Sequence, residues 1–167
     1  MIKKIFFDIT KLCNAKCVYC FTNSTNCKDF AKNELTDLQI FKLIDEANIL
    51  GISGISIGGG EPFLRNITAV GDYAKNKINI SLTSNLTILD EKILEFFKNS
   101  KAKLTISLDA VDEQISEKVR KGVNLPQVIK NIKTLSSFPE ILPRISVRCV
   151  VSAYNYDHVF KIIDFCD

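Results

Sequence analysis

The chain has 167 residues, 46% of them hydrophobic and 25% charged, and a formal net charge of +3, values typical of one globular domain. Its lysines are scattered, without the basic runs interleaved with aromatic residues that follow a nucleic-acid backbone, so no nucleic-acid partner is expected. The apolar run at the N-terminus ends at Asp8, too early for a signal peptide, and no stretch is long enough to span a membrane. We therefore expect a cytoplasmic protein, in which six cysteines indicate metal binding or catalysis rather than disulfides.

Segments typical of strands and helices alternate along the chain. A β-prone segment at residues 4–9 is followed by a polar, cysteine-containing loop over residues 10–33 and by a helix over residues 36–50, for which Thr36 and Asn33 are alternative caps. The later segments are predicted, in chain order, to be a strand at 55–57, a helix at 65–76, a strand at 78–83, a helix at 90–99, a strand at 103–108, helices at 112–120 and 125–136, a strand at 144–151 and a helix at 156–166.

This alternation predicts an α/β fold with a parallel sheet of about five strands and helices outside it. Connections between parallel strands are expected to be right-handed. In such folds the chemistry lies at the carboxyl ends of the strands. Residues able to bind a ligand follow every predicted strand of this chain, which places the candidate site at that edge of the sheet.

The loop after the first strand contains Cys13, Cys17 and Cys20 in the spacing Cys-x3-Cys-x2-Cys. Three thiolates this close in sequence can surround one compact metal centre, and iron–sulfur clusters normally take four cysteines. A cubane held by three cysteines leaves one iron free to bind a small molecule, as the open position does in a catalytic zinc site.

Two alternatives for this loop are a zinc site and a ferredoxin-like electron carrier. Zinc sites favour separated cysteine pairs or cysteine with histidine, and the one histidine, His158, lies far along the chain. A ferredoxin needs a fourth cysteine, for which Cys27 is the candidate. We nevertheless expect Cys27, Cys149 and Cys166 not to be ligands, the last two because they fall on a predicted strand and a predicted helix.

The second predicted strand runs into Gly58-Gly59-Gly60-Glu61-Pro62. Glycines let a ligand approach the backbone closely, and the carboxylate of Glu61 suits an ammonium group. The alternative is a simple glycine-rich turn between a strand and a helix.

Small polar and charged residues follow the third and fourth strands. Ser84 can hydrogen-bond a carboxylate or a hydroxyl, or belong to a turn. Ser107 and Asp109 point to the same side of the fourth strand, and Asp109 can bind a ribose diol or cap the next helix. The guanidinium of Arg120 can pair with a carboxylate, or be an exposed group at a helix end.

Together these residues resemble the radical S-adenosylmethionine superfamily. The resemblance rests on the three-cysteine motif with the aromatic Tyr19 before its last cysteine, Gly-Gly-Glu-Pro at residues 59–62, Ser-Leu-Asp at 107–109 and Arg-Lys-Gly at 120–122. These elements extend over nearly the whole chain, and the cysteine motif is the most specific of them. The fold that the resemblance implies is a partial (β/α) barrel of the TIM type.

The resemblance also implies cofactors and their contacts. Cys13, Cys17 and Cys20 would hold a 4Fe-4S cluster, and the amino and carboxylate groups of S-adenosylmethionine would chelate its open iron. The other implied contacts are the backbone of Gly59, Gly60 and Glu61 for the amino group, Ser84, Ser107 and Arg120 for the carboxylate or the ribose, Asp109 for the ribose, and the backbone around Tyr19 for the adenine.

The activity implied by the resemblance is radical chemistry. One electron, delivered by a low-potential donor such as flavodoxin or ferredoxin, would cleave the sulfur–C5′ bond of S-adenosylmethionine. The 5′-deoxyadenosyl radical would then abstract a hydrogen from the substrate, while the protein orients the reactive atoms and keeps water and oxygen away.

Some features depart from the family pattern. Ala110 stands where many relatives have glycine, and residues 83–85 read Thr-Ser-Asn in place of the commoner Thr-Asn-Gly. The family barrel has six βα units, so we expect residues 1–167 to be a core domain that lacks the last unit and the cysteine-rich C-terminal extension. The fifth strand would then be an unprotected edge.

Among the groups of the superfamily, the motifs most resemble the peptide- and protein-modifying maturases associated with the SPASM extension. Relatives that act on molybdopterin precursors or haem-pathway intermediates come next. The expected substrate is accordingly a peptide or a small molecule. Two other classes stay open, namely a non-catalytic module that binds the cluster and S-adenosylmethionine, and a cluster-based electron carrier.

Overall fold

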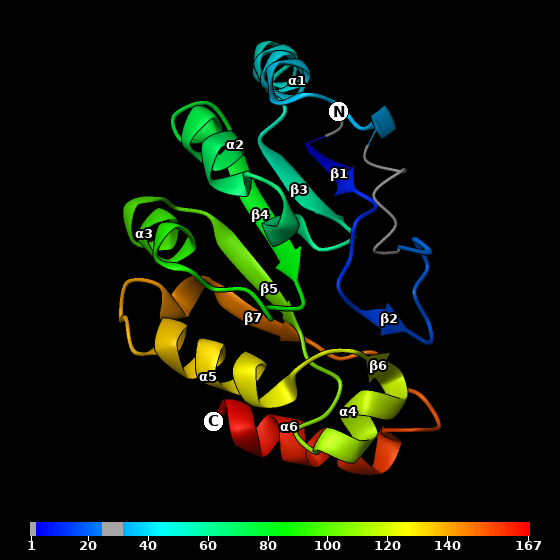
Figure 1. Cartoon of the computed structure of the whole chain (residues 1–167). Coiled ribbons are helices and arrows are strands. Elements are labelled where there is room, and N and C mark those ends of the chain that lie inside the picture. The colour runs from blue at the N-terminus through cyan, green and yellow to red at the C-terminus, as the bar shows by residue number, and fades with distance from the viewer. Residues whose placement is uncertain (1–2, 25–31) are drawn as a thin grey trace.

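The computed structural model describes residues 3–24 and 32–167. Five parallel strands form one sheet in the order β1-β3-β4-β5-β7 (Figure 1), and their bounds are Lys4–Thr10, Gly54–Gly59, Asn79–Ser84, Lys103–Ser107 and Ile145–Arg148. A parallel sheet that keeps its strands in chain order has the connectivity of a TIM-type barrel, here open between β7 and β1. The predicted α/β fold, a partial barrel with a parallel sheet of about five strands, is confirmed.

The helices lie outside the sheet, with α1, α2, α3 and α5 along one face (Figure 1). Over residues 3–24 and 32–167, no helix combines the length and the apolar character that crossing a bilayer requires. The helices are α1 (Asp37–Ile49), α2 (Ile67–Ala74), α3 (Glu91–Asn99), α4 (Glu113–Val119), α5 (Leu125–Ser136) and α6 (Val159–Cys166), with short 3-10 turns η2 (Pro62–Leu64), η3 (Leu142–Arg144) and η4 (Tyr156–His158).

Side-chain caps define where the helices begin. Thr36 caps α1 in a capping box with Gln39, which decides between the two predicted caps. Asp90 caps α3 as its position suggests. Asp112 caps α4 by accepting a hydrogen bond from the backbone N–H of Ile115 (3.0 Å), so the cap of that helix is not Asp109. Asp109 is therefore available for another role.

The two faces of the sheet differ in character. The face toward the helices is apolar and fully buried, and its centre consists of Ile55, Ile57, Leu82, Leu104 and Ile106. The opposite face, called the inner face below, carries mainly polar side chains that are partly or fully exposed: Asp8, Ser56, Ser81, Thr83, Lys103, Thr105, Ser107, Ser146 and Arg148. Its two apolar positions are the exposed Phe6 and the buried Gly58. Parallel sheets are usually covered on both faces, so this polar inner face is a surface suited to a ligand.

Two local features differ from the sequence-based expectation. The last strand ends at Arg148 rather than at residue 151, so Cys149 follows the strand instead of lying within it. A second sheet, which periodicity did not predict, joins β2 (Lys16–Cys17) to β6 (Arg120–Lys121) in antiparallel register. Two-residue strands are too short to produce a recognisable alternation.

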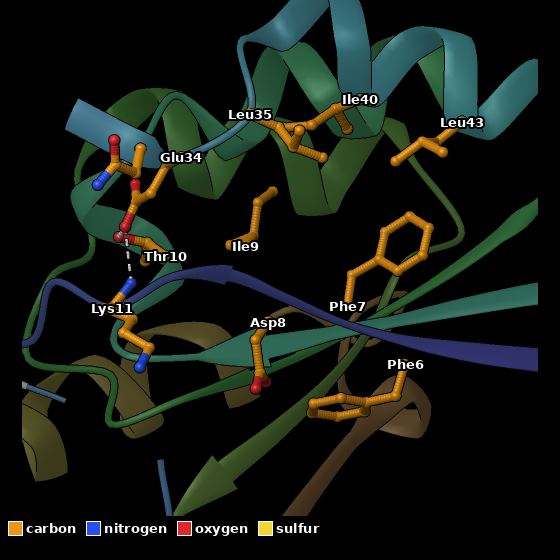
Figure 2. Close-up of a pocket in the computed structure, with 11 residues that line it drawn as sticks. Phe6, Phe7, Asp8, Ile9, Thr10, Lys11, Glu34, Leu35, Ile40 and Leu43 are labelled. Atoms are coloured by element: carbon orange, nitrogen blue, oxygen red, sulfur yellow. Dashed lines mark hydrogen bonds between the residues drawn. The ribbon is translucent and has the colours of Figure 1, made fainter. Parts of the chain in front are cut away.

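The segment before α1 contacts the beginning of the cysteine loop, the name used below for the segment that follows β1 and carries Cys13, Cys17 and Cys20. Glu34 accepts hydrogen bonds from the hydroxyl of Thr10 (2.9 Å) and the backbone N–H of Lys11 (2.7 Å), as Figure 2 shows. Beside this contact, between β1 and α1, is a cavity of about 480 Å³, lined mainly by Phe7, Ile9, Leu35, Ile40 and Leu43 (Figure 2). None of the candidate site residues lines it, so the cavity lies apart from the candidate site.

The glycines after β3 are required by the close approach of the cysteine loop. The backbone N–H groups of Gly60 and Glu61 donate to the carbonyls of Thr10 (2.7 Å) and Leu12 (2.8 Å). A Cβ on Gly60 would lie 2.0 Å from the carbonyl oxygen of Leu12, and Gly59 has a φ of 102°, which favours glycine. The glycine-rich turn therefore anchors the loop that carries the cysteines.

We predict that Gly60→Ala destabilises the cofactor-free protein by about 1–3 kcal/mol, because the added methyl group displaces the backbone of the cysteine loop. The measurement is urea-induced unfolding followed by circular dichroism. Gly54→Ala is the matched control, since a Cβ there meets its nearest neighbour at an ordinary 3.5 Å. Equal stability of the two variants would contradict this account of the turn.

Candidate functional site

The cysteine loop spans the carboxyl edge of the sheet from β1 to β6. At one end it is bonded to the turn after β3, as described above. At the other end Cys17 is the register partner of Arg120, and the backbone N–H of Val18 donates to the carbonyl of Val119 (3.1 Å). Figure 1 shows β2 beside β6, far from the strand that precedes it. The three cysteines are thus presented at the edge where the sequence places the chemistry.

The three thiols of the loop are half-buried. Burial raises the pKa of Cys13 and that of Cys17, and the charge of Arg120 opposes the rise at Cys17. Burial acts in the same direction on Cys20, but hydrogen bonds with the hydroxyl and backbone of Thr22 outweigh it and lower the pKa of that thiol. The three thiols therefore have different environments, which raise the pKa of two of them and lower that of the third.

These residues fit an iron–sulfur cluster by the chemistry of their donors. Cysteine thiolates are the usual ligands of such clusters, and one loop supplies three of them. Within residues 3–24 and 32–167, no group of three or more histidine, cysteine or acidic side chains converges closely enough to hold a single metal ion. A cluster with several irons does not need its thiolates to meet at one point. Cys27, named as a fourth ligand for the electron-carrier alternative, lies outside the described residues.

Glu61 connects the turn after β3 to the end of β4. Its carboxylate is 1% exposed and accepts hydrogen bonds from the hydroxyl of Ser84 (2.7 Å) and the backbone N–H groups of Asn85 (2.7 Å) and Phe63 (3.1 Å). Burial raises the pKa of Glu61, while these donors oppose the rise. The sequence suggested this carboxylate as a partner for an ammonium group, but in the structure its partners are groups of the protein itself. Ser84, expected to contact S-adenosylmethionine, is committed to the same network.

The backbone of the glycine turn is partly occupied as well. Its N–H groups at Gly60 and Glu61 bind the cysteine loop, and the carbonyl of Gly59 accepts a long hydrogen bond from the hydroxyl of Thr22 (3.4 Å). An ammonium group needs acceptors rather than donors, so carbonyl oxygens are the atoms of this turn that suit it.

Asp109, like Glu61, accepts three hydrogen bonds from the protein through its carboxylate. Its side chain is fully buried and pairs with Nη1 of Arg120 (2.8 Å), accepts from the hydroxyl of Tyr19, and accepts from the backbone N–H of Val150 (2.6 Å). Both carboxylate oxygens have protein partners, so Asp109 belongs to the framework beneath the cysteine loop. The ribose contact that the resemblance implied stays a prediction.

Arg120 pairs with a carboxylate, which is one of its two sequence alternatives, and that carboxylate is Asp109. Its side chain is 10% exposed, and its guanidinium faces Asp109 instead of standing free at a helix end. Burial lowers its pKa, but the neighbouring Cys17 and Asp109 outweigh burial and raise it. Its Nε is buried and has no hydrogen-bond partner among the residues that the structure describes. A buried donor without a partner is uncommon and calls for a physical explanation.

Two other predicted residues remain in position for a ligand contact. Ser107 is half-buried on the inner face, beside Arg148 in the register of β5 and β7, and its hydroxyl has no hydrogen-bond partner in the described part of the chain. Tyr19 is half-buried, and its hydroxyl donates to Asp109. Burial and this hydrogen bond raise the pKa of Tyr19, so its side chain is a neutral donor that anchors the cysteine loop.

Several asparagines complete the site without having been predicted. Asn14, next to Cys13, accepts from Nδ2 of Asn85 (2.8 Å) and donates to the hydroxyl of Thr87 (2.7 Å), which ties the cysteine loop to the exit of β4. Asn155 is 1% exposed and donates to the carbonyls of Asp109 (2.9 Å) and Val150 (2.9 Å). Asparagine is common in turns, so the sequence carries no signal that separates these residues from ordinary turn residues.

Residues 7–166 match the family model of the Radical SAM superfamily, and the chain belongs to this family. The prediction of the superfamily is thereby confirmed. A 4Fe-4S cluster and S-adenosylmethionine, the cofactors expected from the resemblance, are those of the family, and the cysteine loop described above is the part of this chain whose chemistry fits the cluster.

The relatives found by sequence and those found by structure have different names. The chain is 32% identical to GTP 3',8-cyclase of Clostridium botulinum over 134 residues, which are 77% of this chain and 42% of that protein. Its fold is similar to that of Streptococcus suis SuiB bound to S-adenosylmethionine, with a TM-score of 0.84, 21% identity and 99% of this chain covered but 38% of that one. It is also similar to anSMEcpe with bound AdoMet, with a TM-score of 0.75, 22% identity, and 98% and 49% of the two chains covered. The chain spans about half the length of these relatives or less.

We predict that Asp109→Asn destabilises the cofactor-free protein by about 3–5 kcal/mol, because it leaves the buried charge of Arg120 without its counter-charge. The measurement is urea-induced unfolding. The matched control is Asp45→Asn, which removes a carboxylate from an exposed pair with Lys77 and should cost much less. If both variants lost the same stability, the buried pair would not be the framework that we describe.

Proposed function

We propose that residues 1–167 form the core domain of a radical S-adenosylmethionine enzyme, with Cys13, Cys17 and Cys20 as the cluster ligands. The observation that carries the proposal is the three-thiol loop held across the carboxyl edge of the sheet by β6 at one end and the glycine turn at the other. The chemistry that such a cluster supplies when bound is one-electron cleavage of S-adenosylmethionine to a 5′-deoxyadenosyl radical, which abstracts a hydrogen atom from the substrate.

The residues of the chain divide into two groups in this proposal. The carbonyl oxygens of Gly59 and Gly60 receive the amino group of S-adenosylmethionine, and the uncommitted hydroxyl of Ser107 receives its carboxylate or ribose. Glu61, Ser84, Asp109, Arg120 and the side chain of Tyr19 hold the loop and the strand ends in place instead, which their buried hydrogen bonds support. The backbone around Tyr19 remains our proposed contact for the adenine.

The edge of β7 supports the proposal that a further βα unit belongs beside it. A cavity of about 860 Å³ runs along β7 between α5 and α6, with apolar walls that include Ile132, Val147, Ile162 and Ile163. Apolar surface beside an open strand edge is what an additional strand and helix would cover. We propose that conversion of the substrate requires such a unit, whereas this chain by itself binds the cofactors and cleaves S-adenosylmethionine.

The substrate that we propose first is a peptide. The inner face is lined by exposed polar side chains across the sheet, which leaves room for an extended chain, and a structure of SuiB, which has the same fold, contains the precursor peptide SuiA. A second candidate is an anionic small molecule such as GTP, the substrate in the name of the relative from Clostridium botulinum. The observation that favours it is the side chain of Arg148, which is exposed beside Ser107 and makes no hydrogen bond or ion pair with the described residues.

The electron donor and location that we propose follow from the chemistry. A low-potential protein such as flavodoxin or ferredoxin would supply the electron. A cytoplasmic location would keep the loop cysteines reduced, as cluster ligation requires, whereas an oxidising compartment would favour disulfides.

We predict that the wild-type protein, reconstituted anaerobically with iron and sulfide and treated with dithionite, converts S-adenosylmethionine to 5′-deoxyadenosine. Cys17→Ala should reduce this product at least 100-fold, because the cluster loses one of its three ligands, whereas Cys166→Ala on the exposed end of α6 should leave it unchanged. Chromatography with mass detection measures the product. Zinc without sulfide in the wild-type protein, or full cleavage by Cys17→Ala, would show that the proposal is wrong.

We predict that GTP, assayed without any peptide, leaves the rate of 5′-deoxyadenosine formation within twofold of the basal rate. Arg148→Ala should then change neither this rate nor the binding of GTP, which calorimetry measures. Lys103→Ala, which removes another cation of the inner face, is the matched control. A GTP-stimulated rate at least tenfold above basal that is lost in Arg148→Ala would replace the peptide by a nucleotide as the substrate.

A further inference from the structure

The buried Nε of Arg120 is a hydrogen-bond donor that the protein leaves without a partner. The guanidinium lies at the base of the cysteine loop, and one of its other nitrogens, Nη1, is held by Asp109 at 2.8 Å. Nε itself has no partner within the described residues. Leaving such a group unpaired costs free energy, and native proteins rarely leave one without an occupant for the position that it faces.

The register of the small sheet places this donor next to a cluster ligand. Arg120 and Cys17 are directly opposite each other in the antiparallel pair of β2 and β6. Directly opposite residues of an antiparallel pair project from the same face, with their Cβ atoms about 4.5–5.5 Å apart. The side chains of Arg120 and Cys17 therefore leave their strands toward the same side.

The rigidity of the guanidinium supports the same assignment. Asp109, fixed by the hydroxyl of Tyr19 and the backbone N–H of Val150, prevents the guanidinium from turning away. The donor is thus preorganised before any cofactor binds.

We propose that the Nε–H of Arg120 donates a hydrogen bond to a sulfur atom of the cluster or of its Cys17 ligand, and that Asp109 is the positioning residue that aims it. This proposal rests on the proposed function, because it requires that the loop hold a cluster. Hydrogen bonds to sulfur are one of the ways in which proteins adjust the reduction potential of iron–sulfur clusters, and groups behind the ligands commonly provide them. Arg120 then makes the cluster easier to reduce, because the hydrogen bond stabilises the added negative charge.

The first test is spectroscopic and needs no variant to detect the contact. Protein labelled with ¹⁵N-arginine is reconstituted anaerobically, reduced, and examined without S-adenosylmethionine by pulsed electron paramagnetic resonance. We expect a ¹⁵N coupling to the cluster, which Arg120→Lys abolishes. Lysine keeps the positive charge but has no Nε–H. Arg144→Lys is the matched control, because Arg144 is also an anchoring arginine but donates to the carbonyls of Ala102 and Phe97, away from the cysteine loop.

The second test measures the midpoint potential of the cluster in the same three proteins. We expect a lower potential in Arg120→Lys than in the wild-type protein, and no change in Arg144→Lys, at equal iron and sulfide content. A cluster without any ¹⁵N coupling, a coupling that persists in Arg120→Lys, or a coupling that appears after S-adenosylmethionine is added but not before would overturn the inference. Failure of the wild-type protein to assemble a cluster would overturn the proposed function itself, so the two failures are distinguishable.

Discussion

The ion pair between Asp109 and Arg120 is the interaction on which the arrangement of the site depends. Its two side chains are 0% and 10% exposed, and a charge at that depth persists because it is paired and hydrogen-bonded. The pair joins the exit of β5 to β6, the hydroxyl of Tyr19 brings in the cysteine loop, and the backbone N–H of Val150 brings in the exit of β7. The cysteine loop, β6 and the exits of β5 and β7 therefore meet at one carboxylate.

A second anchor lies at the other end of the cysteine loop. There the turn at Gly59 and Gly60 admits the backbone of the loop, and Glu61 ties that turn to the exit of β4. With both ends fixed, the loop presents its thiols at the carboxyl edge of the sheet without help from a bound cofactor. Many of the polar groups that the motifs contribute thus hold the loop in place.

The same fold relates this chain to proteins with different names. Likeness to SuiB and anSMEcpe extends over nearly all of this chain at low identity, and the higher identity to GTP 3',8-cyclase covers a shorter stretch. What these solved structures share with this chain is the fold. The inner face of that fold carries small polar side chains together with Phe6 and Arg148.

The sequence by itself determined the order of strands and helices, the parallel sheet and the cysteine motif, because periodicity and ligand spacing are local properties. The tertiary structure alone decided what Asp109, Arg120 and Glu61 do. Each is a charged residue after a strand or helix, and the sequence is consistent with contacts either to a ligand or to the protein. The structure gives all three protein partners, and those partners come from segments that lie far apart in the chain, which no local pattern records.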